Sequence, residues 1–290
     1  MIWAMKEEWF NIYTGFDILY YGTIPNGAGL SSSASIEVLT GFVLKDLFNL
    51  DIDMTKLALL GQKAENKYVG VNCGIMDQFV ISNGKKDCAI FLDTSNLEYE
   101  YAPVNLKNEK IVIMNTNKKR GLGDSKYNER RAECEMALKE LQKELDIKSL
   151  GELSEEEFEK NKYLIKDEKR RKRAKHAVYE NQRTIKAIKA LAENKIELLG
   201  ELMIASHDSL KNDYEVTGKE LDILVEESLK QDGVVGARMT GAGFGGCAVS
   251  IVKNDKVEDF IKNVGKAYKE RIGYDADFYA VEIGNGPTII

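Results

Sequence analysis

The amino-acid sequence predicts an α+β protein with two lobes. Its 290 residues exceed a typical single domain of about 150 residues. Short apolar runs typical of strands are mixed with segments whose apolar residues recur every three or four positions, which is the spacing of an amphipathic helix. Because the order lacks the regular strand–helix alternation of a doubly wound sheet, we expect two α+β lobes, 1–107 and 108–290.

Composition restricts the classes of function. The 41 basic and 47 acidic residues leave a net charge of −6, which argues against a chain that mainly binds nucleic acid. No apolar run approaches the roughly 18 residues of a membrane helix, and Lys6-Glu7-Glu8 stands where a signal peptide would be apolar. The four scattered cysteines and two histidines form neither a CxxC pair nor a multi-histidine metal site. The sequence therefore predicts a cytoplasmic protein that acts on small molecules, without nucleic acid or membrane partners.

The first lobe is predicted to contain strands and helices in mixed order. The aromatic run at 16–21 predicts a strand, and the apolar spacing predicts helices from Leu30 to Phe48 and from about Thr55 to Tyr68. A hairpin follows at 89–101, and a buried strand at 111–114 lies just beyond this lobe. This arrangement places a predicted strand, a turn and a helix around the glycines that follow Pro25.

The second lobe is predicted to be helical from about residue 120 to about residue 229, followed by strands at 234–239 and 247–252, a helix at 257–271 and a strand at 276–283. One helical stretch carries the basic run Lys169-Arg170-Arg171-Lys172-Arg173. We interpret it as the solvated face of a long helix, in preference to an anion or nucleic-acid patch, because the chain as a whole is acidic.

The segment from Pro25 to Ser35 combines glycines with the start of a helix. Free backbone N–H groups at a helix N-terminus, together with the helix dipole, form an anion site, and glycines let the backbone approach a phosphate. The segment is not a Walker A loop, because no Gly-Lys-Ser/Thr follows. A serine-capped helix after a glycine turn is the simpler alternative. Three consecutive serines exceed what a cap requires, which favours phosphate binding.

Two carboxylates follow this loop in the sequence. Glu65 lies on the second predicted helix, and Asp77 lies in the segment Cys73–Gln78. Phosphoryl transfer needs a metal near the phosphates and a group that orients or deprotonates the attacking hydroxyl, and one carboxylate could serve each need. The alternatives are a solvated helix side chain for Glu65 and a helix cap for Asp77, although the apolar neighbours of Asp77 make an unpaired charge costly.

A second glycine cluster runs from Met239 to Cys247. It could be a tight connection between two strands. The number of glycines around Phe244 favours a backbone that passes close to a ligand or to the other lobe.

These segments together resemble the GHMP small-molecule kinases and, among them, the galactokinases. Pro25–Ser35 is similar to the family's phosphate loop, Cys73–Gln78 to the segment with the catalytic aspartate, and Met239–Cys247 to the glycine-rich loop of the C-terminal lobe. Asn115–Asn117 followed by Ser125–Cys134 resembles galactokinases in particular. The four motifs follow the family's order and extend over essentially the whole chain.

The resemblance implies a fold and an activity. The fold would be the two-lobed GHMP-kinase architecture, with a truncated N-terminal lobe like ribosomal S5 domain 2 and a C-terminal ferredoxin-like α/β sandwich lobe. The activity would be transfer of phosphate from ATP to the anomeric hydroxyl of galactose, which yields galactose 1-phosphate and ADP and uses Mg²⁺.

The resemblance also implies roles for individual residues. Asp77 would orient or deprotonate the sugar hydroxyl, Tyr127 would contact galactose, and Ser33 with Glu65 would hold Mg²⁺. The residues implied in binding ATP are Gly27, Ala28, Gly29, Leu30, Ser31, Ser32 and Ser33 of the phosphate loop and Gly241 and Gly243 of the glycine-rich loop.

The sequence departs from the family at its N-terminal side. Galactokinases carry a Gly-Glu-His-Thr-Asp-Tyr signature preceded by an arginine, and this sequence contains no such segment. Met1–Trp9 aligns best with the region after that signature, so we expect a chain that begins within the first lobe. One alternative is therefore a catalytically weak or regulatory relative that binds ATP. Another is a kinase for a different acceptor, such as N-acetylgalactosamine, homoserine or mevalonate, although the Tyr127 segment favours a galactose-type sugar.

Overall fold

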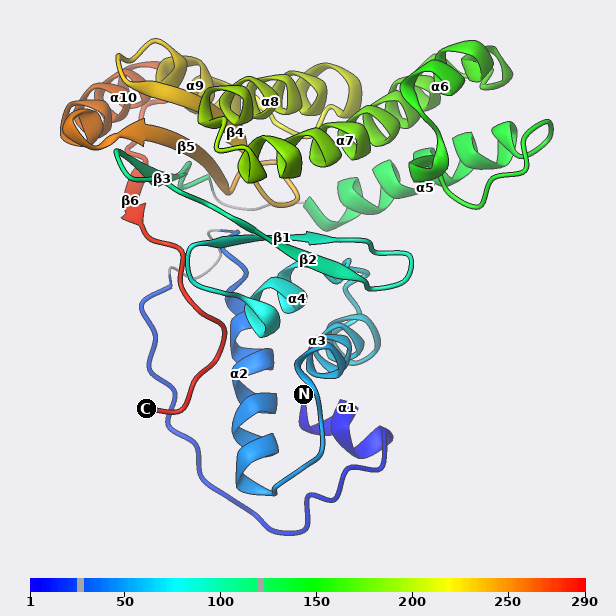
Figure 1. The fold of residues 1–290 in the computed structure, drawn as a ribbon, viewed down its shortest axis with the longest axis vertical. Coiled ribbons are helices and arrows are strands. Elements are labelled where there is room, and N and C mark those ends of the chain that lie inside the picture. The colour runs from blue at the N-terminus through cyan, green and yellow to red at the C-terminus, as the bar shows by residue number, and fades with distance from the viewer. Residues whose placement is uncertain (25–28, 119–122) are drawn as a thin grey trace. The chain divides into compact units, whose positions relative to one another are not determined.

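The computed structural model describes residues 1–24, 29–118 and 123–290 (Figure 1). They form two compact units, which we call the first unit, Met1–Pro103 with Ile283–Ile290, and the second unit, Val104–Glu282. The C-terminal residues belong to the first unit through backbone hydrogen bonds such as that from Gly286 N–H to the Gly84 carbonyl oxygen, 2.8 Å. The lobe boundary between 107 and 108 stays a prediction.

The first unit combines helices with a two-stranded antiparallel sheet. Its elements are α1 (Ile2–Glu7), α2 (Ser32–Leu47), α3 (Met54–Lys63), the π-helical segment η1 (Ala64–Val69), α4 (Met76–Asn83), β1 (Cys88–Leu92) and β2 (Tyr99–Pro103). The predicted helices and the predicted hairpin are confirmed. The apolar faces of α1, α2 and α3 meet in a core that includes Met5, Val38, Leu44, Leu57 and Leu60.

The predicted strand at 16–21 is wrong, because this segment makes no strand pairing in the structure. Its aromatic side chains have other partners. The Phe16 ring packs edge-on against Phe48 with centroids 5.9 Å apart, and the Tyr20 hydroxyl shares a 2.6 Å hydrogen bond with Thr40 Oγ1. A strand requires a neighbour for its backbone groups, and among the described residues β1 and β2 pair only with each other. An apolar pattern alone cannot supply that neighbour.

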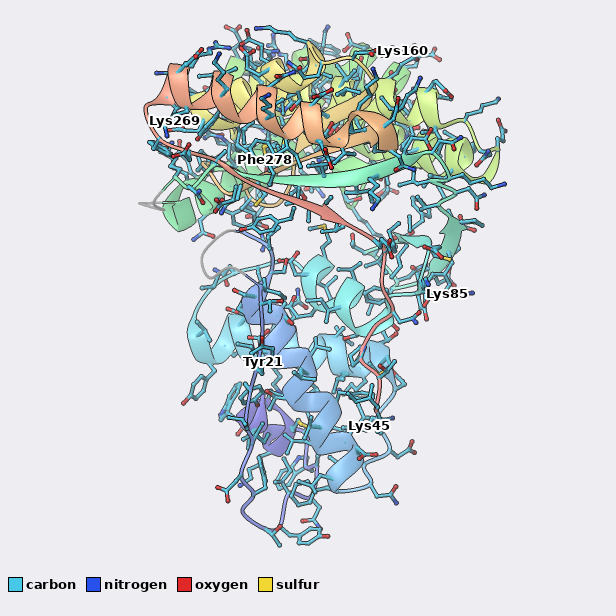
Figure 2. The ribbon with its side chains drawn as sticks, turned by 90° about the vertical axis from the view of Figure 1, so that its left-hand side faces the viewer. Tyr21, Lys45, Lys85, Lys160, Lys269 and Phe278 are labelled. Carbon is cyan, nitrogen blue, oxygen red and sulfur yellow. The ribbon has the colours of Figure 1, made fainter. Side chains whose placement is uncertain are left out.

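The second unit contains an antiparallel sheet with the strand order β4-β5-β3-β6. The strands are β3 (Glu109–Asn115), β4 (Val234–Met239), β5 (Cys247–Lys253) and β6 (Asp277–Val281), as predicted from their apolar runs. Helices α8 (Ile196–Ser209), α9 (Lys219–Leu229) and α10 (Val257–Ile272) cover one face of it (Figure 1). Phe278 of β6 packs against Phe260 of α10 with ring centroids 6.4 Å apart (Figure 2).

The rest of the second unit is helical. The helices are α5 (Gly123–Leu141), α6 (Glu155–Asn161) and α7 (Glu168–Ala192), with short 3₁₀ turns η2 (Leu150–Glu152), η3 (Lys162–Leu164) and η5 (Asn254–Lys256) and the π-helical segment η4 (Leu210–Tyr214). Ser154 and Glu157 form a capping box at the start of α6, and the Asp167 carboxylate caps α7. In the part of the chain that the structure describes, every helix is too short or too polar to span a bilayer.

The interpretation of the basic run at 169–173 as a solvated helix face is wrong for Arg173. Its side chain is 0% exposed and forms ion pairs with Glu133 and Glu215. Lys169 is exposed, as expected. Because a helix repeats about every 3.6 residues, any five consecutive residues of a packed helix include some that face its neighbour. In the 25-residue helix α7, Arg173 of this run faces α5.

Helix α8 meets strand β4 at two glycines. A Cβ atom built on Gly200 would overlap the Val235 carbonyl oxygen and lie 2.7 Å from the carbonyl carbon, and a Cβ on Gly236 would lie 2.6 Å from the Gly200 Cα. These distances are shorter than non-bonded carbon contacts allow. Bare backbone therefore sets the spacing between the helix and the sheet.

We predict that Gly200→Ala destabilises the protein by about 3 kcal/mol, because the added methyl group overlaps backbone that cannot move independently. Helix propensity alone would predict the opposite, a gain of about 1 kcal/mol for alanine inside a helix. Urea unfolding measures the difference. The matched control is Gly151→Ala, where the nearest atom to the added methyl is 3.6 Å away. A Gly200→Ala protein as stable as the wild type would contradict the close contact.

Candidate active site

The serine run forms the start of α2. Gly27 and Ala28 lie outside the described residues, whereas Gly29 to Ser33 are described. Gly29 and Ser31 have φ angles of 76° and 55°, so the backbone passes twice through the left-handed region before α2 begins at Ser32. Ser31 occupies the N-cap position, but its side chain makes no capping hydrogen bond. The serine-cap alternative is therefore wrong, and N–H groups of the first turn remain available to an anion.

Glu65 lies in the π-helical segment that continues α3. Its side chain is 8% exposed, so the alternative of a solvated helix residue is wrong. Its backbone carbonyl oxygen accepts hydrogen bonds from the N–H groups of both Gly70 and Val71, at 2.8 and 3.0 Å. Single π-helical turns inside helices occur frequently at functional sites. Here the π-helical turn η1 ends the helix that begins with α3, and the side chain of Glu65 in this turn is buried.

A hydrogen-bonded junction joins the three segments that carry the predicted site residues of the first unit. Glu37 lies one turn after Ser33 on the same face of α2, and the Glu65 carboxylate lies close enough to raise the pKa of Glu37. Glu37 Oε2 also accepts a 3.1 Å hydrogen bond from Nε2 of Gln78, which directly follows Asp77 on α4. The junction therefore brings α2, η1 and α4 together.

The junction is compact because glycine makes room for it. Gln78 is 2% exposed, and a Cβ atom on Gly61 of α3 would lie 3.0 Å from Gln78 Cγ. Burial raises the pKa of Glu37 to about 7, the hydrogen bond from Gln78 opposes this rise, and the negative charge of Glu65 adds to it. Burial and the nearby charge of Glu65 both disfavour the charged form of Glu37.

Sequence reasoning missed Glu37 and Gln78. Two signals could have found them: Glu37 follows Ser33 at the helical spacing of four, and Gln78 is adjacent to Asp77.

Asp77 is half-buried in the first turn of α4. The N-cap residue of this helix is Ile75, so the alternative that Asp77 caps the helix is wrong. A negative charge in the first turn is stabilised by the helix dipole. Asp77 is thus placed on a rigid helix that is held to α2 through its neighbour Gln78.

The donor groups near this junction fit a magnesium ion. The Ser33 hydroxyl and the Glu65 carboxylate are hard oxygen donors, and Mg²⁺ in nucleotide sites commonly takes one or two protein ligands together with phosphate oxygens and water. Among the described residues no group of three or more His, Cys, Asp and Glu side chains could hold a metal by itself. A two-ligand site completed by phosphate is the arrangement that these residues can offer.

The glycine-rich loop connects β4 to β5 in the second unit, as the strand prediction required. Gly241, Gly243 and Phe244 have φ angles of 75°, 82° and 58°. Gly243 packs directly on the backbone of Val216, whose carbonyl oxygen accepts a 2.7 Å hydrogen bond from the Phe244 N–H. The Gly246 carbonyl oxygen accepts hydrogen bonds from both N and Oγ1 of Thr116, each 2.9 Å. The loop is therefore held from two sides.

Tyr127 lies half-buried on α5, one turn before Arg130. Arg130 is 7% exposed and its Nε donates to the Tyr214 carbonyl oxygen at 2.8 Å. The Glu133 carboxylate accepts from Arg130 at 3.1 Å and from Arg173 at 2.7 Å. The segment Ser125–Cys134, which resembles galactokinases, is thus held by a buried cluster of ion pairs among Arg130, Glu133 and Arg173.

The predicted site residues are divided between the two units. Ser33, Glu65 and Asp77 belong to the first unit, where the Glu37 junction connects their segments. Tyr127 and the glycine-rich loop belong to the second unit, where the backbone from 213 to 216 lies between them.

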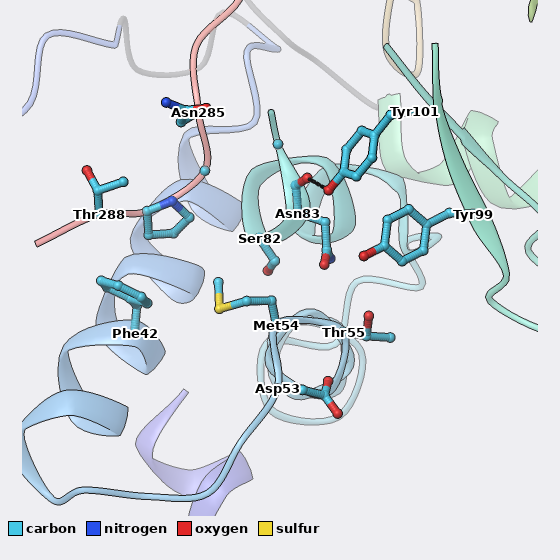
Figure 3. Close-up of a pocket in the computed structure, with 13 residues that line it drawn as sticks. Phe42, Asp53, Met54, Thr55, Ser82, Asn83, Tyr99, Tyr101, Asn285 and Thr288 are labelled. Carbon is cyan, nitrogen blue, oxygen red and sulfur yellow. Dashed lines mark hydrogen bonds between the residues drawn. The ribbon is translucent and has the colours of Figure 1, made fainter. Parts of the chain in front are cut away.

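A separate pocket of about 660 Å³ lies in the first unit (Figure 3). Phe42, Met54, Ser82 and Tyr101 are among its lining residues, which include none of the predicted site residues. The Tyr101 hydroxyl donates a 2.6 Å hydrogen bond to the carbonyl oxygen of Asn83 at its edge. The sequence predicted no function for this pocket.

Comparison with known proteins assigns the family. Residues 1–85 match the model of the GHMP kinases N terminal domain, and residues 187–270 match GHMP kinases C terminal. A galactokinase from Clostridium acetobutylicum is 62% identical over 276 residues, which cover 95% of this chain and 71% of that protein. This chain belongs to the galactokinase family. A galactokinase from Lactiplantibacillus plantarum is also 62% identical, over 94% of this chain and 70% of its own length.

The structural comparison agrees with the family. The crystal structure of Lactococcus lactis galactokinase complexed with galactose matches with a TM-score of 0.96 and 56% identity, over 99% of this chain and 74% of that one. A mevalonate kinase matches with a TM-score of 0.58 at 22% identity and shows the shared fold alone. The α+β, two-lobed GHMP kinase fold predicted from the sequence is confirmed. The chain spans about 70–75% of the length of these galactokinases.

A buried histidine lies behind the backbone at 213–216. His176 of α7 is 7% exposed, its ring stacks on Tyr214 with centroids 4.4 Å apart, and its Nδ1 lies 3.0 Å from Ser209 Oγ. Burial lowers the pKa of His176 from 6.5 to about 4. The neutral ring is therefore the form that the folded protein accommodates.

We predict that His176 makes the protein less stable in acid. Because the pKa in the folded state is depressed, this stability is complete above the unfolded pKa of about 6.5 and is lost as the pH falls toward about 4. Between about pH 7.5 and pH 5 the loss amounts to about 2 kcal/mol. Urea unfolding at the two pH values, in the wild type and in His176→Gln, isolates the contribution. An equal pH dependence in both proteins would contradict the assignment.

Proposed function

We propose that this chain transfers the γ-phosphoryl group of ATP to the anomeric hydroxyl of galactose and releases galactose 1-phosphate and ADP. The observation that carries the proposal is the 57–62% identity to named galactokinases over nearly the whole chain. The match to a galactokinase that was crystallised with galactose supports the sugar as substrate. Galactose and ATP are then the partners, and ATP as co-substrate supports a cytoplasmic location.

In this proposal, the start of α2 binds the phosphates of ATP. Gly27 to Ser33 surround the phosphates, and N–H groups of the first turn donate to phosphate oxygens. Ser33 and Glu65 would hold Mg²⁺, which would supply positive charge against the phosphates of ATP. The part-buried Glu37–Gln78 hydrogen bond holds α2 and α4 together beside the Glu65 segment.

Asp77 would orient the sugar hydroxyl and accept its proton. A bond forms between the sugar oxygen and the γ-phosphorus, the bond from that phosphorus to the bridging oxygen breaks, and ADP leaves with the electron pair. Tyr127 would contact galactose, and Gly241 and Gly243 would contribute to the ATP site. Because such transition states involve spread charge and little covalent participation by the protein, positioning and electrostatics supply most of the rate.

The function is tested by coupled ADP release with galactose, glucose and N-acetylgalactosamine as acceptors. We expect turnover with galactose and at most weak turnover with glucose. Turnover with N-acetylgalactosamine but not with galactose would show that the acceptor is N-acetylgalactosamine. ATP binding by titration calorimetry, without galactose binding or turnover, would instead indicate a nucleotide-binding relative that performs no transfer.

We predict that Asp77→Asn lowers kcat for galactose by about 10²–10⁴-fold, because the amide cannot accept the proton of the sugar hydroxyl. The protein should remain folded, since asparagine has nearly the same shape and Gln78 keeps its contact with Glu37. The control is Asp51→Asn, an exposed position between helices α2 and α3. Unchanged turnover in Asp77→Asn would refute the role of this carboxylate.

We predict that Glu65→Gln raises the Mg²⁺ concentration needed for half-maximal activity by about tenfold or more, because a charged oxygen ligand is lost. The substitution also removes the like-charge contact with Glu37, so it should not destabilise the fold. A magnesium titration of ADP release measures the effect, with the exposed Glu100→Gln of β2 as control. The same magnesium dependence in Glu65→Gln and the wild type would remove Glu65 from the metal site.

A further inference from the structure

The backbone from Asp213 to Val216, which we call the 213–216 segment, contacts two site regions of the second unit. On one side it bonds to residues of α5 and α7, and on the other it bonds to the glycine-rich loop. The segment leaves η4 at Tyr214 and turns at Glu215, whose φ angle is 56°. A left-handed conformation at a residue other than glycine persists only where its surroundings hold it in place.

Two arginines hold the segment by its backbone. Arg130 Nε donates to the Tyr214 carbonyl oxygen at 2.8 Å, and its Nη2 donates to that of Glu215 at 3.4 Å. Arg173 Nη1 donates to the Asp213 carbonyl oxygen at 2.6 Å, and its Nη2 donates to the Glu215 carboxylate at 2.8 Å. Three successive carbonyl groups are therefore bonded by two guanidinium groups.

The two arginines are themselves held rigidly. Arg130 and Arg173 are 7% and 0% exposed, and the Glu133 carboxylate accepts a hydrogen bond from each of them. Charge-assisted hydrogen bonds of this kind are short and directional. Because Arg130 follows Tyr127 by three positions on α5, its place on the 213–216 segment also determines where Tyr127 lies relative to that segment.

The other side of the segment contacts the glycine-rich loop directly. The Val216 carbonyl oxygen accepts a 2.7 Å hydrogen bond from the Phe244 N–H. A Cβ atom on Gly243 would overlap that oxygen and lie 3.0 Å from the Val216 carbonyl carbon. With two backbones in contact and no side chain between them, a shift of Val216 must shift the loop.

We propose that Arg130 and Arg173 are positioning residues that hold the 213–216 segment in place. Through this segment they fix the position of the glycine-rich loop at Gly243 and Phe244 relative to the part of α5 that carries Tyr127. The inference rests on the proposed function for the roles of Tyr127 in sugar binding and of the loop in ATP binding. A buried guanidinium group needs acceptors beyond a carboxylate for its five donors, and the position of those acceptors decides what it holds in place. Here both guanidinium groups also bond to backbone carbonyls of the connecting segment.

Arg130→Met tests the proposal. It removes the bonds to Tyr214 and Glu215 and leaves Glu133 paired with Arg173, so no charge is stranded. We expect amide hydrogen exchange at Phe244 to become about tenfold faster, while exchange in β5 around Ile251 keeps its wild-type rate. We also expect the KM for ATP to rise about tenfold, with a smaller change in kcat.

Two further variants separate positioning from charge and from local disturbance. Arg130→Lys keeps the charge but lacks the planar fork that reaches two carbonyls, so it should not restore the exchange rate at Phe244. Lys175→Ala removes an ion pair to the side chain of Asp213, 3.2 Å long, without touching the arginine bonds, and should change neither readout.

Three outcomes would overturn the proposal. They are unchanged exchange at Phe244 in folded Arg130→Met, equal acceleration at Phe244 and Ile251, and faster exchange at Phe244 without a change in the KM for ATP. If the wild type releases no ADP with galactose, the proposed function fails by itself. The exchange rates, with ATP affinity measured by titration in place of KM, then still decide whether the arginines position the loop.

Discussion

The contact among Glu37, Glu65 and Gln78 is the constraint on which the candidate site of the first unit depends. Three segments that are distant in sequence meet at one half-buried carboxyl group, whose pKa burial raises to about 7. Removing polar groups from water is costly unless they bond to one another. Hydrogen bonding and the close packing that Gly61 permits offset this cost. In return, the start of α2, the acidic turn of η1 and the helix that carries Asp77 acquire a defined spacing, which phosphoryl transfer requires.

In the second unit, direct contacts between backbone segments define the spacing of elements. Its glycines permit these close contacts. Gly243 lets the loop contact Val216 directly, and Gly200 lets α8 contact β4 directly. Where two backbones touch without an intervening side chain, there is little freedom for either to shift. The buried arginines extend this rigidity, because each guanidinium group bonds to both carboxylate and carbonyl oxygens at directions set by its plane.

Local patterns predicted most elements of the fold and failed where an element depended on a distant partner. Apolar spacing predicted α2, α3, α10 and the strands of the four-stranded sheet, because burial of one face is a local property of the sequence. The same logic predicted a strand at 16–21, which is absent because strand pairing requires a neighbour. The basic run predicted a solvated Arg173, because charged side chains in such runs usually face water. In the structure, ion pairs with Glu133 and Glu215 allow its burial. Glu37 was missed because its helical spacing from Ser33 places it on the same helix face but does not reveal that Glu65 lies near it.

The sequence by itself determined the family, the α+β architecture and the order of the glycine-rich and acidic motifs, because these follow from short-range spacing and from residue types whose backbone or chemical properties are intrinsic. Tertiary structure alone decided which polar groups are buried together. The cost of burying a charge depends on partners that lie tens or hundreds of residues away in the chain. It also decided that Asp77 does not cap α4 and that the Ser31 side chain makes no capping hydrogen bond at α2, since a helix end takes its geometry from the packing of the whole helix.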